Sequence, residues 1–296
     1  MGGYSKILVA FDGSESSRNA LRQAVEQFHR SWIKVLAVVP AYEGDLELVG
    51  VRDLKGVLSV PTDGLLEVAR ELAGADADRI ITNVEQGEVY EKIVDVARDE
   101  DCHLIVMGRR GLHRLENMLL GSVTARVITH WDGDVLVVPR DSKVQWSNIV
   151  VAVDGSSHSD AALDKAIELS RGRDDPVYLT IVSVTDLYPE FYADSAIVGS
   201  LFGSKKEAVV DTMEKKTAIV LERARSRAAA AGVEAGIELL RGDPAEEVAA
   251  YADQVRAGII FAGSRGRSGL KKMLMGSVTE KIIGLSRCPV FITRAV

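Results

Sequence analysis

Met107–Thr124 reads MGRRGLHRLENMLLGSVT, and Ala262–Thr279 reads AGSRGRSGLKKMLMGSVT. Both stretches share one spacing, in which a glycine is followed after two residues by a second glycine and after nine more by Gly-Ser. Each follows an apolar run typical of a buried parallel strand, and each precedes a helical pattern. Glycine lets the backbone approach an anion, and the N–H groups at a helix start carry partial positive charge. The two stretches therefore predict two phosphate sites, although either one alone could be a simple chain turn.

The phosphate contacts are expected from the loop glycines and from the first residues of the following helix. Neither loop closes with Gly-Lys-Ser/Thr, and neither carries the Rossmann glycine triplet, so both differ from those phosphate loops. Valine in place of Gly263 and Gly266 should block phosphate while the sheet stays folded. The residues expected at the phosphates are Gly108, Gly111, Gly121, Ser122 and Val123 in the first stretch, and Gly263, Gly266, Gly276, Ser277 and Val278 in the second.

The chain is an internal repeat. Lys6–Leu21 (KILVAFDGSESSRNAL) matches Asn148–Leu163 (NIVVAVDGSSHSDAAL). The offset between the copies is 142 residues here and 155 at the glycine loops, so the second half holds about 13 more residues before its loop. We therefore predict two domains of ordinary size, residues 1–144 and 145–296.

Alternating strand and helix patterns predict a doubly wound parallel sheet in each half, because the strands are nearly continuous apolar runs. Such sheets bind ligands at the carboxyl ends of their strands. Asp12 and Asp154 follow the first strand of each half and should face the same crevice as the glycine loops. The first half should be irregular over Pro40–Pro61, with a helix over Gly64–Ala73, whereas the second half has a long helix over Lys205–Ala231.

These residues resemble the universal stress protein family in its tandem two-domain form. The resemblance rests on VAFDGS and VAVDGS, on the two glycine loops and on the final CPVFIT, and it covers nearly the whole chain. It implies an α/β fold of two tandem five-stranded sheets in the order 3-2-1-4-5, similar to the adenine nucleotide alpha hydrolases. It also implies ATP at each loop, a cytoplasmic role in stress survival, and pairing of the two domains through their fifth strands.

Two further pairs of residues are assigned to the sites. Asp12 and Asp154 could reach the ATP phosphates through Mg²⁺, which prefers oxygen ligands, but Asp-Gly-Ser is also a common turn composition. Val38 and Val184 align at the end of the second strand of each half. The resemblance implies that their backbone reads the adenine edge, while their side chains fit buried strand positions.

The two sites are expected to be unequal, with the second tighter. Arg109, Arg110 and Arg114 against Glu116 give the first loop a sum of +2, whereas the second loop reaches +4. That second sum comes from Arg265, Arg267, Lys271 and Lys272. The second loop also has small Ser264 where the first has Arg109, and Ser277-Val278-Thr279-Glu280 reads as a helix capping box.

Composition excludes several other classes. A net charge of −7 disfavours bulk nucleic-acid binding, and no apolar run of about 18 residues predicts a membrane span. Cys102 and Cys288 form no pair motif, which favours a reducing cytoplasm. The five histidines are scattered and form no Cys/His cluster of the zinc type.

We interpret the chain as an ATP-binding stress or regulatory module with one nucleotide site per domain, Mg²⁺ as a second cofactor and an unknown protein partner. A slow Mg-dependent ATPase and a scaffold with unused nucleotide sites stay open. No arginine finger or water-positioning residue stands out, which favours binding over catalysis. Exposed sheet edges invite pairing, so Val135–Val138 and Val290–Thr293 are expected to pair antiparallel within one chain, with homodimerisation left open.

Overall fold

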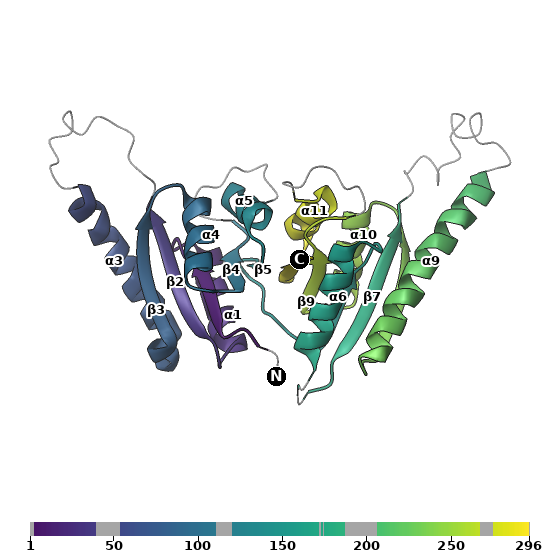
Figure 1. Cartoon of the computed structure of the whole chain (residues 1–296), viewed down its shortest axis with the longest axis horizontal. Helices are drawn as coiled ribbons and strands as arrows, with labels where there is room; N and C mark the ends of the chain where they lie inside the picture. Colours follow the sequence, from purple (N-terminus) through teal and green to yellow (C-terminus); the bar gives the residue numbers. More distant parts are fainter. Residues whose placement is uncertain are drawn as a thin grey trace. The chain divides into compact units, whose positions relative to one another are not determined.

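The structure is a computed structural model that describes residues 3–39, 54–110, 120–171, 173, 175–186, 206–266 and 275–295. The chain divides into two compact units, Gly3–Lys143 and Val144–Val296, which we call the first and the second half (Figure 1). Each half is a sheet with helices on both faces.

The first half contains five parallel strands in the order β3-β2-β1-β4-β5. Helices α1 and α3 pack against each other on one face of this sheet, and α4 and α5 pack against each other on the opposite face. Its elements are β1 Lys6–Ala10, α1 Glu15–Gln27, β2 Trp32–Val39, α3 Leu54–Ala73, the 3₁₀ turn η1 Gly74–Arg79, β3 Ile80–Gln86, α4 Val89–Asp99, β4 Leu104–Gly108, α5 Ser122–His130 and β5 Asp134–Val138.

The second half repeats the arrangement in the order β8-β7-β6-β9-β10, with every pair parallel. The order 3-2-1-4-5 is thereby confirmed within each half. Its elements are β6 Asn148–Ala152, α6 Ser157–Ser170, β7 Tyr178–Thr185, α9 Lys206–Ala230, β8 Ala235–Arg241, α10 Pro244–Gln254, β9 Ile259–Gly263, α11 Ser277–Leu285 and β10 Val290–Thr293.

The apolar strands form the core of each half. Ile7, Leu8 and Val9 of β1 are fully buried, because helices cover both faces of the sheet and leave no polar side for these residues. In the second half, the rings of Phe261 on β9 and Phe291 on β10 stack with their centroids 4.9 Å apart. Burial of apolar area on both faces is the main stabilisation of such a sheet.

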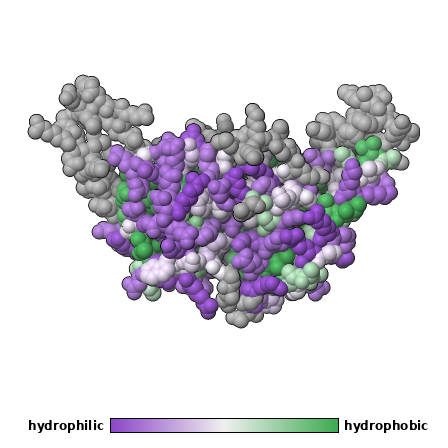
Figure 2. All heavy atoms as spheres, viewed as in Figure 1, coloured by the Kyte–Doolittle hydropathy of each residue, from purple (hydrophilic) through white to green (hydrophobic). Residues whose placement is uncertain are grey.

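On the face shown in Figure 2, the described surface is mainly hydrophilic, with apolar side chains in scattered patches. Among the large apolar side chains, Tyr178 and Ile219 are about two-thirds exposed, at 69% and 68%. Isolated apolar side chains of this kind are ordinary on soluble domains. No helix among the described residues is long and apolar enough to cross a membrane.

One predicted boundary is wrong. Residues 54–61 were expected to be irregular, but α3 begins at Leu54 and runs through Pro61 to Ala73. Leu54, Val57 and Leu58 continue the helical spacing of apolar residues. This pattern outweighs the proline, although a proline inside a helix removes one backbone hydrogen bond and crowds the carbonyl of the preceding turn. The remainder of the predicted irregular segment, residues 40–53, lies outside the described residues.

The long helix of the second half is confirmed. It was expected over Lys205–Ala231 and is observed as α9, Lys206–Ala230, which packs on β7 and β8. The expected pairing of the two fifth strands concerns how the halves meet and stays a prediction.

Candidate functional site

Each Asp-Gly-Ser stretch is a turn that carries the chain from the first strand into its helix. Asp154 Oδ1 accepts a hydrogen bond from Ser156 N–H at 2.9 Å, and Gly155 adopts a φ of +82°, a left-handed conformation that favours glycine. Ser156 then caps α6, because its Oγ accepts from Ser159 N–H at 3.2 Å. The turn reading of the aspartate is therefore correct, and the turn also fixes the carboxylate at the end of β6.

The first half builds the same turn. Asp12 Oδ1 accepts from Ser14 N–H at 3.0 Å, Gly13 has a φ of +76°, and Ser14 Oγ accepts from Ser17 N–H at 3.2 Å. Asp12 and Asp154 are thus in equivalent positions, each held by one of its oxygens at the carboxyl end of the central strand.

The first glycine of each loop is required by packing. A Cβ added to Gly263 would lie 2.7 Å from the carbonyl carbon of His158, and a Cβ added to Gly108 would lie 2.8 Å from that of Ser16. Real side chains do not approach a backbone so closely, so the strand end and the helix start touch because the side chain is absent. The expectation that valine at Gly263 leaves the fold intact is therefore wrong.

The second glycine of the loop has a different neighbour. A Cβ added to Gly266 would lie 2.8 Å from Oδ2 of Asp154, and among the described residues no backbone atom lies within 4 Å of it outside its own chain neighbours. Gly266 thus brings the loop backbone against the carboxylate, which links the two sequence motifs directly. Its counterpart, Gly111, lies outside the described residues.

The helix after each loop begins without a side-chain cap. Gly276 is the N-cap of α11, Gly121 is the N-cap of α5, and neither has a side chain to bond to the first-turn N–H groups. The capping-box prediction is wrong, because Ser277 is the first residue inside the helix rather than the cap. The first-turn N–H groups of an α-helix have no partner within the helix and can receive an external anion.

A threonine ties each helix start to its strand. Thr279 Oγ1 donates to the Gly263 carbonyl at 2.7 Å, and Thr124 Oγ1 donates to the Gly108 carbonyl at 3.1 Å. The loop is closed by a second bond, since Gly276 N–H donates to Ser264 O at 2.9 Å. These bonds fix the distance between the strand end and the helix start in both halves.

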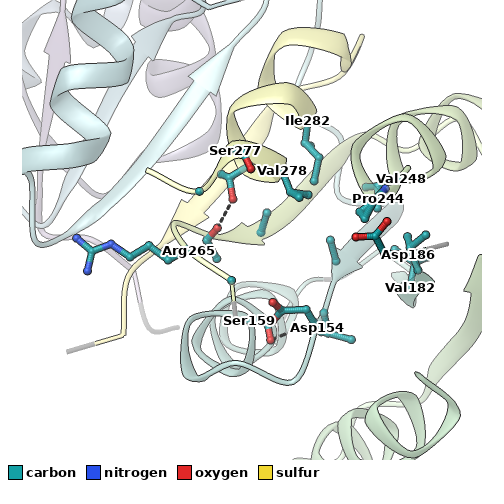
Figure 3. A pocket seen from close by; sticks show the side chains of 18 residues that line it. Asp154, Ser159, Val182, Asp186, Pro244, Val248, Arg265, Ser277, Val278 and Ile282 are labelled. Carbon is teal, nitrogen blue, oxygen red and sulfur yellow. Dashed lines mark hydrogen bonds between the residues drawn. The ribbon is translucent and has the colours of Figure 1, made fainter. Parts of the chain in front are cut away.

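The second half encloses a pocket of about 500 Å³ between these elements (Figure 3). Val182, Val248 and Ile282 give it an apolar wall, while Asp154, Ser277 and Arg265 give it polar groups. All seven residues that the sequence assigned to this half line the pocket: Asp154, Val184, Gly263, Gly266, Gly276, Ser277 and Val278.

The alternation of side chains along β7 decides which of them face the pocket. Thr185 Oγ1 is 3.0 Å from Thr217 Oγ1 on α9, so its neighbours Val184 and Asp186 point to the opposite face, towards the pocket. Val182 O accepts from Val153 N–H, so the backbone groups of Val184, two residues on, also point to the β6 side. The pairing of β6 with β7 ends at Ala152 and Val182, so these groups lie beyond the end of β6.

Sequence reasoning missed Asp186, Pro244 and Val248 as lining residues. Counting two residues on from Val184 along the strand would have identified Asp186, because side chains on one face recur every second residue. Asp243-Pro244 is a helix-start signal, but nothing in the sequence shows that this start lies over β7.

Helix α6 of the second half carries a histidine, His158, that has no counterpart in the first half and does not line the pocket. His158 Nδ1 accepts a hydrogen bond from Ala295 N–H at 2.9 Å, so the proton of the neutral ring is on Nε2. Burial lowers the pKa of His158, the positive charges of Arg265 and Arg294 lower it further, and Asp154 opposes them. Ser16 occupies this position in the first half.

The predicted residues of the first half follow the same pattern. Asp12, Val38 and Gly108 lie at the carboxyl ends of β1, β2 and β4, three adjacent strands, and Gly121, Ser122 and Val123 lie at the start of α5. Next to this loop, burial and the charge of Arg110 lower the pKa of Arg109, whereas buried Ser264 takes that position in the second half. Within the described residues, no group of three or more His, Cys, Asp or Glu side chains could hold a metal ion by itself.

Comparisons with known proteins find similar proteins for both halves of the chain. A model of the Universal stress protein family matches residues 3–139 and again residues 145–294. Universal stress protein YxiE of Bacillus subtilis (strain 168) is 34% identical over 151 residues, which is 50% of this chain and 99% of that protein. Universal stress protein E of Salmonella typhi is 22% identical over 304 residues, covering 99% of this chain and 95% of its own.

The fold also has a solved counterpart. The crystal structure of a universal stress protein from Archaeoglobus fulgidus DSM 4304 superposes with a TM-score of 0.69 at 23% identity, covering 98% of this chain and 96% of that chain. At this level of identity the likeness supports the fold alone.

Proposed function

The chain belongs to the universal stress protein family, a family of stress-response proteins, and we propose that each of its halves binds one ATP molecule as a regulatory ligand. The observation that carries this proposal is the pocket of the second half, because both sequence motifs and the end of β7 converge on it. The first half repeats the turn, the glycine contact and the threonine bond, and on that basis it receives the second nucleotide.

The two ends of the pocket suit the two ends of a nucleotide. The base fits the apolar part between Val182, Val248 and Ile282, with the backbone of Val184 available to its hydrogen-bonding edge. The phosphates fit the start of α11, where Ser277 is exposed and no side chain caps the first turn. Arg265 lines the same end and supplies positive charge.

The donor set fits Mg²⁺ as a partner of the nucleotide. Mg²⁺ is usually held by one or two carboxylates together with phosphate oxygens and water, rather than by a full cage of side chains. Asp154 would supply the carboxylate in the second half and Asp12 in the first, each already oriented by the N–H of its turn serine. The ion would neutralise phosphate charge between the carboxylate and the glycine loop.

Nucleotide occupancy would then change the surface that the start of α11 or α5 offers to a protein partner. Cys102 and Cys288 are free thiols, which supports placing this role in the cytoplasm. We infer binding rather than turnover, since the sequence offers no arginine finger or water-positioning residue that could be assigned to hydrolysis.

A negative charge added at the start of α11 tests the proposal without disturbing the fold. In Ser277→Glu, a carboxylate in the first turn stabilises the helix by about 0.3–1 kcal/mol but repels phosphate. Ser277→Gln is the matched control, because it has the same size without the charge. Placing each variant in a Ser122→Glu background leaves only the second site to be measured.

Titration calorimetry with ATP and Mg²⁺ is the measurement. Ser122→Glu alone should retain one site, and adding Ser277→Glu should weaken that site by roughly 100-fold, because like charges in contact cost several kcal/mol. Adding Ser277→Gln instead should leave it within a few-fold. Equal affinity of the Glu and Gln variants would refute phosphate binding at this helix, and phosphate release during the titration would support the ATPase alternative.

A further inference from the structure

Asp186 is a pocket residue of the second half to which the family motifs give no role. It follows the last residue of β7, is exposed, and lines the pocket beside Pro244 and Val248. Figure 3 shows its carboxylate on the side of the pocket formed by Val182, Val248 and Pro244, across from Ser277 and Arg265. The strand order agrees, because β6 separates β7 from β9.

We propose that the Asp186 carboxylate accepts a hydrogen bond from the six-position amine of a bound purine and so makes the second site selective for 6-amino-purine over 6-oxo-purine nucleotides. The inference rests on the proposed nucleotide binding and adds to it a residue that determines base specificity. Asp186 is not one of the phosphate or metal contacts, because those lie at the start of α11 and at Asp154.

The position of the Asp186 carboxylate favours a contact with the base. Val184 on β7 and Asp186 directly after the strand both line the pocket, whereas Thr185 between them contacts α9. A base whose edge meets the Val184 backbone therefore lies next to the Asp186 side chain. An ionised carboxylate can only accept hydrogen bonds, so it requires a donor on that edge of the ligand.

The purine bases differ in the group that they would present to this carboxylate. Adenine presents an amine donor at its six-position, whereas guanine presents a carbonyl acceptor there, as does hypoxanthine. A carbonyl oxygen beside Asp186 would place two acceptors in contact with no proton between them. Sites that offer a polar partner to one ligand group discriminate against analogues that lack this group, because the partner then loses its bond to water without replacement.

Lys281 is close enough to Asp186 for their charges to interact, but it is already paired with Asp243. Its Nζ lies 3.1 Å from Asp243 Oδ2, and the hydrogen bond to Asp243 is the main cause of the raised pKa of Lys281, with Asp186 a minor contributor. No hydrogen bond or ion pair joins the Asp186 side chain to another described residue. The Asp186 carboxylate is therefore available to a ligand, because the ion pair between α10 and α11 joins Lys281 to Asp243 instead.

The first half provides an internal control. The sequence has Pro40 two residues after Val38, where the second half has Asp186 two residues after Val184. Proline offers no acceptor on its side chain. If Asp186 reads the amine, base selectivity should differ between the sites even though both retain the valine.

Competition binding in the two single-site backgrounds tests the proposal. Ser122→Glu reports the second site and Ser277→Glu the first, with ATP, inosine triphosphate and 2′-deoxy-ATP as competitors. In the Ser122→Glu background, Asp186→Asn should lower the preference for ATP over inosine triphosphate by roughly tenfold, because an amide can also donate to the six-position carbonyl. Asp186→Ala should weaken ATP and relieve the clash of acceptors with inosine triphosphate, but it adds no new hydrogen bond to the six-position carbonyl.

The possible outcomes distinguish a failure of the Asp186 role from a failure of nucleotide binding. An unchanged ATP-to-inosine-triphosphate ratio in Asp186→Asn, with ATP still bound, overturns the role of Asp186 and leaves nucleotide binding intact. A change confined to the ATP-to-2′-deoxy-ATP ratio overturns it in favour of a ribose contact. Absence of ATP binding in the Ser122→Glu background overturns the proposed function itself. The first site should show the lower ATP preference and should not respond to Asp186→Asn.

Discussion

The two halves share the contacts that build the loop and differ in the residues around it. Thr124 and Thr279 make the same bond to the same strand glycine, and both Asp-Gly-Ser turns have the same hydrogen bonds. Around them, Ser16 is replaced by His158 and Arg109 by Ser264. The two halves therefore share the contacts that form the loop, whereas the residues packed around the loop differ.

The helices above the sheet show the same division. An ion pair joins Arg126 on α5 to Glu88 at 2.9 Å, and the equivalent pair in the second half joins Lys281 on α11 to Asp243 at 3.1 Å. Only Asp243 also caps its helix, by accepting from Ala245 N–H and Glu246 N–H. At this position Glu88 of the first half forms an ion pair, whereas Asp243 of the second half forms an ion pair and also caps its helix.

The largest expected effect tests what is shared. Gly263→Ala should destabilise the second half by about 1–3 kcal/mol or more, because its Cβ would meet the His158 backbone and overpacked sites cost this much. Gly108→Ala should do the same in the first half, where the Cβ would meet Ser16. Urea unfolding, followed by a probe in each half, gives the free energies.

Gly266→Ala is the matched control for that experiment. Among the described residues, its Cβ would meet the end of the Asp154 side chain rather than a backbone, so the fold should change by less than about 0.5 kcal/mol. The variant should instead weaken ATP, since the carboxylate would be displaced. If Gly263→Ala is as stable as Gly266→Ala, the packing role of the first glycine is wrong.

These glycines also show how far the sequence could predict the molecule. The strand, loop and helix pattern was readable because each element is local and repeated, and the order of strands followed from the family resemblance. The neighbour of Gly263 was not readable, because His158 is more than a hundred residues away and no local pattern joins the two. Asp186 could have been predicted as a lining residue from the alternation of side chains along the strand. The absence of a side-chain cap at Ser277 could not, because it depends on which residue of Gly-Ser-Val-Thr begins the helix.

A smaller effect is expected in affinity, where the second site should bind ATP roughly tenfold more tightly than the first. The capping box no longer supports this difference, and Ser264 is buried outside the pocket lining, which weakens the crowding argument. The loop charges remain. Two additional positive charges near a partly exposed phosphate contribute about 0.5–1 kcal/mol each, less in high salt.

Calorimetry in the Ser122→Glu and Ser277→Glu backgrounds measures the two constants. Lys271→Ala combined with Lys272→Ala brings the second loop to the same formal charge as the first and should remove most of the difference. Raising the salt concentration should reduce it as well. Equal constants at low salt, or a tighter first site, would show that loop charge does not set the ranking.

The smallest effect is a pH dependence confined to the second half. The folded pKa of His158 is lowered by burial and by Arg265 and Arg294, so the unfolded chain takes up this proton more readily than the folded chain. Stability should therefore decline as pH falls from about 6.5, the ordinary histidine value, through the lower folded pKa, and then level off. Solvent around the ring screens these charges, so the loss should stay below about 1 kcal/mol.

His158→Gln isolates this effect from the other four histidines, because only its own titration is lost. The difference in unfolding free energy between wild type and variant should fall with acid over this pH range. The amide proton of Ala295 gives a second readout, since protonated His158 cannot accept its hydrogen bond and the NMR shift should follow the titration. Ser16 has no proton to take up in this range, so the first half should show no counterpart. A midpoint at or above 6.5, or an Ala295 shift that does not titrate, would mean that solvent rather than the Arg265–Arg294 surroundings sets the state of this ring.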